Sequence, residues 1–439
     1  MHPGAAGRAY WQAGEEYVII SDGYDLYRFP VKGGKSECLT LNGRKENIRY
    51  TLNELDEETR GKQVDVAQSH ILTGFNTVDR TSGYYKVKNL LKPSKPVVLA
   101  WGKCRYASLN KAQDASVLTF TQQSFEQMPD IWRTDLNFRK PMQLTRMVDQ
   151  QKQFIWGSPE LIHWTSYKGV QLDGVIYKPA NFDPTKKYPL IVNFYERNAD
   201  ELYSARVPNP GRSTPDYHMY LSQGYVIFNP DVRYTTGHPG ESCYDCVMSG
   251  IDSVCALGFI DESRIGATGH SWGGYQVAYL ATRTNRFAAI ESGAPVVNMF
   301  SAYGGIRWAT GRARAFQYEH TQSRLGTTMW ENPEIYAENS PLMQMHKVTT
   351  PILIMANDTD GHVPYTQGIE MFVAMKRLNK PAWLLNYTGE PHWPCMTSNR
   401  VDFQIRLLQF FNHYLKGEPM PTWMSEGIRA VDQPYELGY

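Results

Sequence analysis

The sequence lacks long apolar runs, a charge imbalance and a dense cysteine pattern, and each absence excludes a class of protein. Its 439 residues hold 45 basic and 44 acidic side chains, a formal net charge of +1. A nearly neutral chain offers no electrostatic case for binding nucleic acid or an anionic membrane surface. No apolar run approaches the about 18 residues of a membrane span, and residues 1–11 lack the apolar core of a signal peptide. We therefore expect no membrane span. The compartment stays open: cytoplasmic by default, and periplasmic or secreted if the chain derives from a longer precursor.

Cysteine is scarce, with six residues spread along the chain. Cys243 and Cys246 form a C-x-x-C, but Cys243 lies on an apolar stripe of helical period with Val247 and Ile251. This stripe favours core packing over redox or zinc chemistry. No second C-x-x-C completes a zinc site. The sequence thus predicts no metal and no organic cofactor.

What the sequence does contain is a strand, a tight turn and a helix around a single serine. Residues 264–268 predict the strand and residues 276–283 the helix, and between them stands G-H-S-W-G-G-Y with Ser271 at its centre. This pattern is typical of the G-x-S-x-G nucleophile elbow, whose glycines permit a strained turn that holds the serine Oγ out over the sheet. The turn also points the N–H of Trp272 toward a developing oxyanion. The alternative is a glycine-rich turn with an incidental serine.

A serine nucleophile needs a base, and the base needs an orienting carboxylate. In proteins with a nucleophile elbow both follow the serine along the chain, the acid first and the histidine last. Residues 351–355 (PILIM) predict a buried strand, followed by a polar loop with Asp358 and Asp360. Residues 382–387 predict the next strand, and His392 follows it. Since open α/β sheets place ligands outside the carboxyl ends of their strands, His392 is the candidate base.

A helix is predicted between these two strands, at residues 367–378. It carries Ile369, Phe372 and Val373 at helical spacing. This spacing is typical of a helix.

Other histidines and a second aspartate compete for the same roles. His270 points away from the neighbouring serine side chain along an extended backbone, and His362 precedes the last strand, so topology argues against both. Asp358 and Asp360 share one loop, and their spacing alone leaves the choice between them open.

Several motifs occur in a fixed order along the chain: GVIYKP at 174–179, YPLIVNFY at 188–195, GYVIFNPD at 224–231, the elbow, and D-x-x-V at 360–363 followed by His392. With these motifs, the chain from about residue 159 to 416 resembles the catalytic domain of the prolyl oligopeptidase family. Its dipeptidyl peptidase and acylaminoacyl peptidase branches are the nearest. The resemblance implies an α/β-hydrolase fold and hydrolysis by a serine nucleophile.

The resemblance also implies roles for particular residues. The acid is the aspartate of D-x-x-V, which selects Asp360, and Tyr195 supplies a phenolic O–H to the oxyanion hole beside the Trp272 N–H. It further implies side chains that contact substrate, at Val296, Tyr303 and Val363. The chain departs from the family after Ala-Pro-Val, where the aromatics that box a P1 proline are not matched. Proline specificity is therefore not implied.

The first third of the chain repeats itself. Asp25-Leu26-Tyr27-Arg28 recurs as Asp130-Ile131-Trp132-Arg133, each followed by Leu-Thr at the same spacing, and a weaker copy begins at Gly83. Offsets of 58 residues (25 to 83) and 47 residues (83 to 130) match one four-stranded blade per repeat. In the resembled family a complete β-propeller caps the hydrolase. About three blades cannot close, so we expect a shortened propeller that self-associates into a homo-oligomer.

Together these observations predict an α/β protein with three parts. They are a partial β-propeller at residues 1–155, an α/β-hydrolase domain with a doubly wound, mostly parallel sheet at 156–420, and a tail at 421–439. We expect a serine peptidase that cleaves a peptide or small acyl substrate through Ser271, Asp360 and His392. A carboxylesterase with the same triad is the alternative. A catalytically silent binding scaffold is disfavoured because every triad position is filled.

Overall fold

The structure is a computed structural model that describes residues 7–55, 61, 63–429, 431–433 and 436–439. The chain divides into two compact units. One comprises Trp156–Ala199 and Pro208–Tyr439; the other comprises the described residues of His2–Ile155 together with Asp200–Val207. We call them the hydrolase unit and the N-terminal unit.

The hydrolase unit is built on an eight-stranded sheet, in which the second strand is antiparallel to both of its neighbours and all the other neighbouring strands are parallel. The strand order is β13 (Ser158–Thr165), β14 (Gln171–Lys178), β16 (Val226–Pro230), β15 (Tyr188–Asn193), β17 (Ile260–His270), β18 (Ala289–Gly293), β21 (Ile352–Met355) and β22 (Ala382–Leu385). The central strands β15, β16 and β21 are mostly apolar and buried along their whole length, as expected for strands that helices cover on both faces. This sheet confirms the predicted α/β-hydrolase fold.

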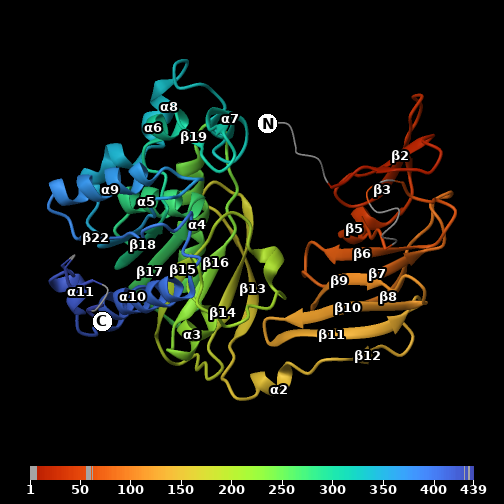
Figure 1. Cartoon of the computed structure of the whole chain (residues 1–439), viewed down its shortest axis with the longest axis horizontal. Coiled ribbons are helices and arrows are strands. Elements are labelled where there is room, and N and C mark those ends of the chain that lie inside the picture. The colour runs from red at the N-terminus through yellow and green to blue at the C-terminus, as the bar shows by residue number, and fades with distance from the viewer. Residues whose placement is uncertain (1–6, 56–60, 62, 430, 434–435) are drawn as a thin grey trace. The chain divides into compact units, whose positions relative to one another are not determined.

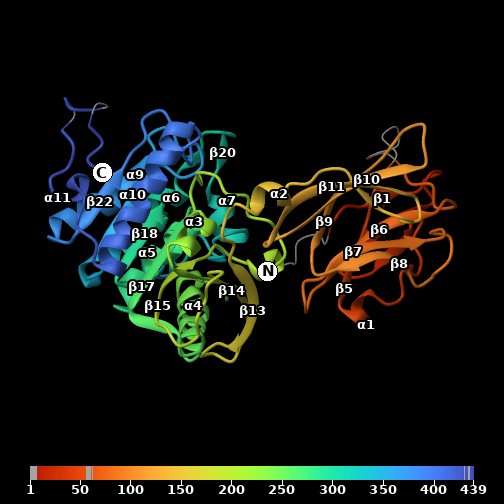
Figure 2. The ribbon, with the colours of Figure 1, turned by 90° about the horizontal axis from the view of Figure 1, so that it is seen from below.

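Helices cover both faces of the sheet (Figures 1 and 2). One face carries α4 (Pro239–Cys255), α5 (Trp272–Arg283) and α9 (Tyr365–Arg377), whose buried side chains share one core with the sheet. The other carries α3 (Tyr217–Ser222) and α10 (Thr397–Lys416), which meet through the rings of Tyr220 and Phe411. Cys243 and Cys246 are buried on α4 with free thiols, so the stripe on which Cys243 lies is core packing.

Of the three apolar side chains whose spacing indicated α9, only Phe372 packs against the core. Ile369 and Val373 are exposed, whereas Met371 and Met375 are buried. Gly368 sets this rotation, because a Cβ there would lie 2.4 Å from the Ala356 Cβ, so only glycine allows the helix so close to the end of β21.

Shorter elements follow β18 and complete the unit. They are α6 (Met299–Tyr303), β19 (Ile306–Arg307), β20 (Arg312–Ala313), α7 (Ala315–His320), α8 (Pro333–Glu338), η2 (Pro341–Lys347) and, near the end of the chain, α11 (Thr422–Ser425). The indole N–H of Trp383 on β22 donates to the Met424 carbonyl oxygen (2.8 Å), which ties the last segment to the sheet.

The described residues of the N-terminal unit form three four-stranded antiparallel sheets, as the sequence repeat predicts. Two short helices, α1 (Gly43–Glu46) and α2 (Val148–Gln151), and the 3₁₀ turn η1 (Ala199–Glu201) accompany them. The first sheet contains β1 (Tyr10–Trp11), β2 (Tyr17–Ser21), β3 (Leu26–Pro30) and β4 (Glu37–Cys38). The second contains β5 (Ile48–Leu52), β6 (His70–Asn76), β7 (Ser82–Val87) and β8 (Val97–Gly102), and the third β9 (Arg105–Lys111), β10 (Val117–Ser124), β11 (Gln127–Asp135) and β12 (Met142–Gln143).

A buried aspartate explains the strongest part of the repeat. Asp25 accepts a hydrogen bond from Thr40 Oγ1 (2.6 Å) and two more from backbone N–H groups. Asp130 accepts the same bond from Thr145 Oγ1 (2.8 Å) and another from a backbone N–H. Each pair links the third strand of its sheet to the segment after the fourth, because a buried carboxylate must be satisfied by local donors. The weaker copy at Gly83 also lies on a third strand, without the aspartate.

Candidate active site

Four predicted site residues lie at one edge of the hydrolase sheet. Tyr195 follows β15, Ser271 follows β17, Asp360 follows β21 and His392 follows β22. These strands run parallel in one sheet, with β18 between β17 and β21, so their carboxyl ends lie at the same edge.

Ser271 occupies a strained turn between β17 and α5. Its backbone angles are φ 61° and ψ −115°, outside the regions that a residue with a side chain ordinarily adopts. The flanking glycines permit the turn: a Cβ on Gly269 would lie 2.5 Å from the Gly273 oxygen, and one on Gly273 would lie 2.8 Å from the Phe194 oxygen. Trp272 begins α5, so its N–H belongs to the unpaired first turn of a helix. This geometry is that of a nucleophile elbow.

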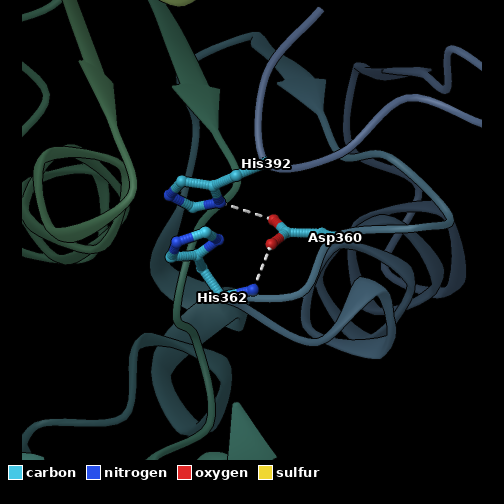
Figure 3. Close-up of side chains that lie close together, drawn as sticks. All are labelled: Asp360, His362 and His392. Carbon is cyan, nitrogen blue, oxygen red and sulfur yellow. Dashed lines mark hydrogen bonds and ion pairs between the residues drawn. The ribbon is translucent and has the colours of Figure 1, made fainter. Parts of the chain in front are cut away.

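A short hydrogen bond joins the candidate acid and base (Figure 3). His392 Nδ1 lies 2.6 Å from Asp360 Oδ2, and the two residues are 5 % and 7 % exposed. The other oxygen, Oδ1, accepts from the backbone N–H groups of His362 (2.7 Å) and Val363 (2.9 Å). Both carboxylate oxygens are therefore satisfied in a buried site, and the histidine ring is held in one orientation.

The three residues before Asp360 hold its loop against the loop of His392. Asn357 Nδ2 donates to the Pro391 oxygen (2.8 Å), and Thr359 Oγ1 donates to the Glu390 oxygen (2.6 Å). Asp358 Oδ1 accepts from the backbone N–H of Gly389 (2.8 Å) and remains exposed. Asp358, which spacing could not separate from Asp360, therefore bonds the histidine loop rather than the histidine ring.

Tyr195 is fixed at both ends. Gln276 Nε2, on α5, donates to its backbone oxygen (2.5 Å), and Gln322 Nε2 donates to its hydroxyl (2.5 Å). Burial raises the pKa of the Tyr195 phenol, while hydrogen bonds with Gln322 and Ser271 act in the opposite direction. The phenol thus stays protonated, next to the serine, and able to donate.

A relay of side chains continues behind Tyr195. Gln322 Oε1 accepts from Gln317 Nε2 (2.8 Å), and Gln317 Oε1 accepts from Arg307 Nε (3.1 Å). Sequence reasoning missed these three residues. Gln322 stands 127 positions after Tyr195 in a segment without a recognisable motif, so no sequence signal identifies it.

The three predicted substrate-contacting side chains are buried in one apolar cluster beside the elbow. Val296 is 3 %, Tyr303 5 % and Val363 6 % exposed, and the cluster also contains Trp272. The Tyr303 hydroxyl donates to Glu319 Oε1 (2.6 Å). A role in substrate contact remains a prediction for these residues, which together form the apolar layer next to Ser271.

The two competing histidines lie against His392. The ring centroids of His270 and His392 are 4.6 Å apart, and those of His362 and His392 are 4.9 Å apart. Burial, and secondarily the charge of His392, hold the pKa of His270 well below its usual range and also lower that of His362. Neither ring bonds Asp360 among the described residues; His362 reaches it only through its backbone N–H.

A buried glutamate lies on the strand next to the elbow. Glu291, on β18, is fully buried; its Oε2 accepts from Thr268 Oγ1 (2.6 Å), and its Oε1 has no partner among the described residues. Burial raises the pKa of Glu291 to about 8. Between the ordinary glutamate pKa and pH 8, Glu291 is therefore protonated in the folded protein and ionised in the unfolded chain.

We expect Glu291→Gln to flatten the dependence of stability on pH. In the wild type this glutamate makes the free energy of unfolding fall as pH rises from about 4.5 to 8, by at most about 1.4 kcal/mol per pH unit, because the unfolded state binds fewer protons. Glutamine keeps the acceptor for Thr268 and has no proton to lose. Denaturant unfolding at pH 5 to 9 measures the effect, with the exposed Glu334→Gln as the control. Parallel pH curves for wild type and Glu291→Gln would contradict the assignment.

Known proteins are similar to this chain in sequence. The model of the prolyl oligopeptidase family matches residues 216–418. The "Uncharacterized peptidase YuxL" of Bacillus subtilis is 27 % identical over 246 residues, which cover 53 % of this chain and 35 % of that protein. Dipeptidyl-peptidase 5 of Porphyromonas gingivalis is 24 % identical over 258 residues, 54 % of this chain and 35 % of that protein. The match thus spans about a third of the length of these relatives.

Solved structures share the fold over nearly the whole chain. A putative dipeptidyl aminopeptidase IV from Bacteroides ovatus superposes with a TM-score of 0.71 at 20 % identity, over 93 % of this chain and 59 % of that one. A puromycin-hydrolyzing peptidase of Mycobacterium tuberculosis gives a TM-score of 0.71 at 16 % identity, over 94 % of this chain and 62 % of that one.

In the part of the chain that the structure describes, none of the helices combines the length and apolar character that crossing a bilayer requires.

Proposed function

We propose that this chain is a serine peptidase of the prolyl oligopeptidase family, whose model matches residues 216–418, and that Ser271 is its nucleophile. Its base is His392, and its orienting acid is Asp360. The observation that carries the proposal is the buried 2.6 Å bond between Asp360 and His392, at the same sheet edge as a serine in a strained elbow. The charge of Asp360 favours the imidazolium that forms when His392 accepts a proton.

The proposed reaction is acyl transfer to water in two steps. His392 takes the hydroxyl proton of Ser271 as its Oγ attacks the substrate carbonyl carbon, and it then gives this proton to the leaving amine as the C–N bond breaks. A water molecule next attacks the acyl-enzyme, with its proton passing to His392 and from there to the departing Ser271 Oγ. The tetrahedral oxyanion of each step accepts hydrogen bonds from the Tyr195 hydroxyl and the Trp272 N–H.

Covalent labelling tests this proposal directly. We expect a fluorophosphonate probe to form one adduct, at Ser271, which peptide mapping by mass spectrometry locates. A panel of peptide amides and matched esters then reports which acyl bonds are cleaved. An adduct at another serine, or no adduct on folded protein, would contradict the assignment of the nucleophile.

Loss of the Tyr195 hydroxyl should slow turnover. We expect Tyr195→Phe to lower kcat about 10²-fold to 10³-fold with little change in KM, because a donor that acts on the transition-state oxyanion is removed while the ring remains. Steady-state kinetics on the best peptide substrate measures both constants. The matched control is Tyr203→Phe, which removes the hydroxyl of another tyrosine, eight residues after Tyr195. An effect confined to KM would make Tyr195 a substrate-binding residue instead.

Gln322 should act through Tyr195 as a positioning residue. Its amide donates to the phenol oxygen, so the phenol proton stays available to bond the oxyanion. We expect Gln322→Leu to lower kcat about 10-fold, the worth of one hydrogen bond, and to have no further effect when Tyr195 is already phenylalanine. A double-mutant cycle on kcat measures this coupling. Additive effects would show that Gln322 acts independently of Tyr195.

A further inference from the structure

His362 lies against the proposed catalytic pair, and the proposed reaction does not use its side chain. Its ring stacks on that of His392, with centroids 4.9 Å apart and planes inclined by 26°. Figure 3 shows both rings on the same side of the Asp360 carboxylate. The Nδ1 atom of His362 is buried and has no hydrogen-bond partner among the described residues.

These three side chains bring metal-binding atoms together. Asp360, His362 and His392 each offer one ligand atom, and these atoms all lie within 4.8 Å of one another. Two imidazole nitrogens and a carboxylate oxygen are a donor set that suits zinc and its neighbours among the divalent transition metals. Calcium and magnesium prefer sites made of oxygen atoms.

The loop is held so that His362 keeps this place. Its backbone N–H donates to Asp360 Oδ1 (2.7 Å), and the guanidinium of the fully buried Arg314 donates to its backbone oxygen. Arg314 also donates to the Ala302 oxygen (3.1 Å) and to the Tyr318 hydroxyl (2.8 Å). The main chain at His362 is thus fixed on both sides, while the Nδ1 atom of its ring has no hydrogen-bond partner among the described residues.

We propose that Asp360, His362 and His392 form an inhibitory site for a divalent transition-metal ion, with zinc as its representative. The ligands are Nδ1 of His362, Nδ1 of His392 and a carboxylate oxygen of Asp360, and water completes the tetrahedron. Zinc–nitrogen bonds of about 2.0 to 2.1 Å place tetrahedral ligands about 3.4 Å apart, so the three donors must shift by about 1 Å. Rotation of the His362 ring about its side-chain bonds can bring its Nδ1 into range, while His392 Nδ1 and Asp360 Oδ2, which lie 2.6 Å apart, must separate by about 0.8 Å.

Zinc at this site would stop the proposed reaction. The ion takes the place of the proton between His392 Nδ1 and Asp360 Oδ2, and the neutral His392 ring then carries its one proton on Nε2, the nitrogen that must accept the Ser271 proton. His392 can take no further proton there, and it also loses the carboxylate that stabilises its imidazolium. The inhibition, though not the binding, rests on the proposed function of Asp360 and His392.

Two measurements test the site. The first is direct binding of zinc to Ser271→Ala by isothermal titration calorimetry, which needs no turnover; we expect one ion per chain, and loss of this binding in Ser271→Ala/His362→Ala. The second is inhibition of the wild-type enzyme, reversed by a chelator. We expect His362→Ala to keep its activity without zinc and to need at least 10-fold more zinc for half inhibition. His362→Leu keeps more of the side-chain bulk and should behave alike.

The matched control is His346→Ala, which removes an exposed histidine of η2 and should leave binding and inhibition unchanged. Zinc that fails to bind Ser271→Ala, or that binds and inhibits equally well without His362, would overturn the site. Zinc that binds through His362 while turnover continues would uphold the site and overturn the catalytic roles of Asp360 and His392. The two failures are therefore distinguishable.

Discussion

Ser271→Ala is expected to abolish fluorophosphonate labelling and to lower kcat by about 10⁶-fold, with the fold unchanged. The reason is that the nucleophile disappears, and without it the remaining groups can only assist direct attack by water. Alanine at φ 61° keeps the strain of the elbow, so stability should hardly change. Intact-protein mass spectrometry and steady-state kinetics measure the two effects.

The matched control is Ser263→Ala, which removes an exposed hydroxyl on the same strand. It should label and turn over as the wild type does. A folded Ser271→Ala protein with near wild-type turnover of the best substrate would overturn the proposed mechanism entirely.

The second large effect is expected from the acid and the base. Asp360→Asn and His392→Ala should each lower kcat by about 10⁴-fold or more, because the serine proton then has no oriented acceptor. The two effects should not add in the double variant, since the residues act as a unit. Steady-state kinetics of the single and double variants measures this.

The neighbours of this pair provide matched controls. Asp358→Asn keeps an oxygen for the Gly389 N–H, and His362→Ala removes a ring that has no hydrogen bond to Asp360 among the described residues. Both variants should retain activity within a few-fold of the wild type. The reverse ranking, with Asp358 essential and Asp360 dispensable, would reassign the acid of the loop.

Local patterns predicted the framework of the site because they act over a few residues. Glycines on both sides of the serine remove the steric clashes that would otherwise forbid the strained turn, so the elbow could be identified from seven residues. The strand before Asp360 was predicted because a continuous apolar run suits a strand buried on both faces, as β21 is. The repeat around Asp25 and Asp130 was visible because its hydrogen bonds join residues 15 positions apart, at equal spacing.

The orientation of α9 depends on one residue. The apolar spacing of Ile369, Phe372 and Val373 indicated a helix, but Gly368 brings this helix close to Ala356, so that Phe372 packs against the core while Ile369 and Val373 stay exposed. Periodicity counts apolar side chains along one helix. It carries no information about which backbone will approach most closely.

The sequence by itself determined the fold class, the repeat, the nucleophile elbow and the strands whose ends carry the acid and the base, because each depends on local spacing. Only the tertiary structure decided which aspartate bonds the His392 ring, which face α9 buries, and what holds the Tyr195 hydroxyl. It also placed the ring of His362 against that of His392 and joined Tyr195 to Gln322, 127 positions away. The physical reason is that side-chain hydrogen bonds and ring contacts depend on distances of a few ångströms between loops, and these distances are set by how the strands assemble rather than by spacing along the chain.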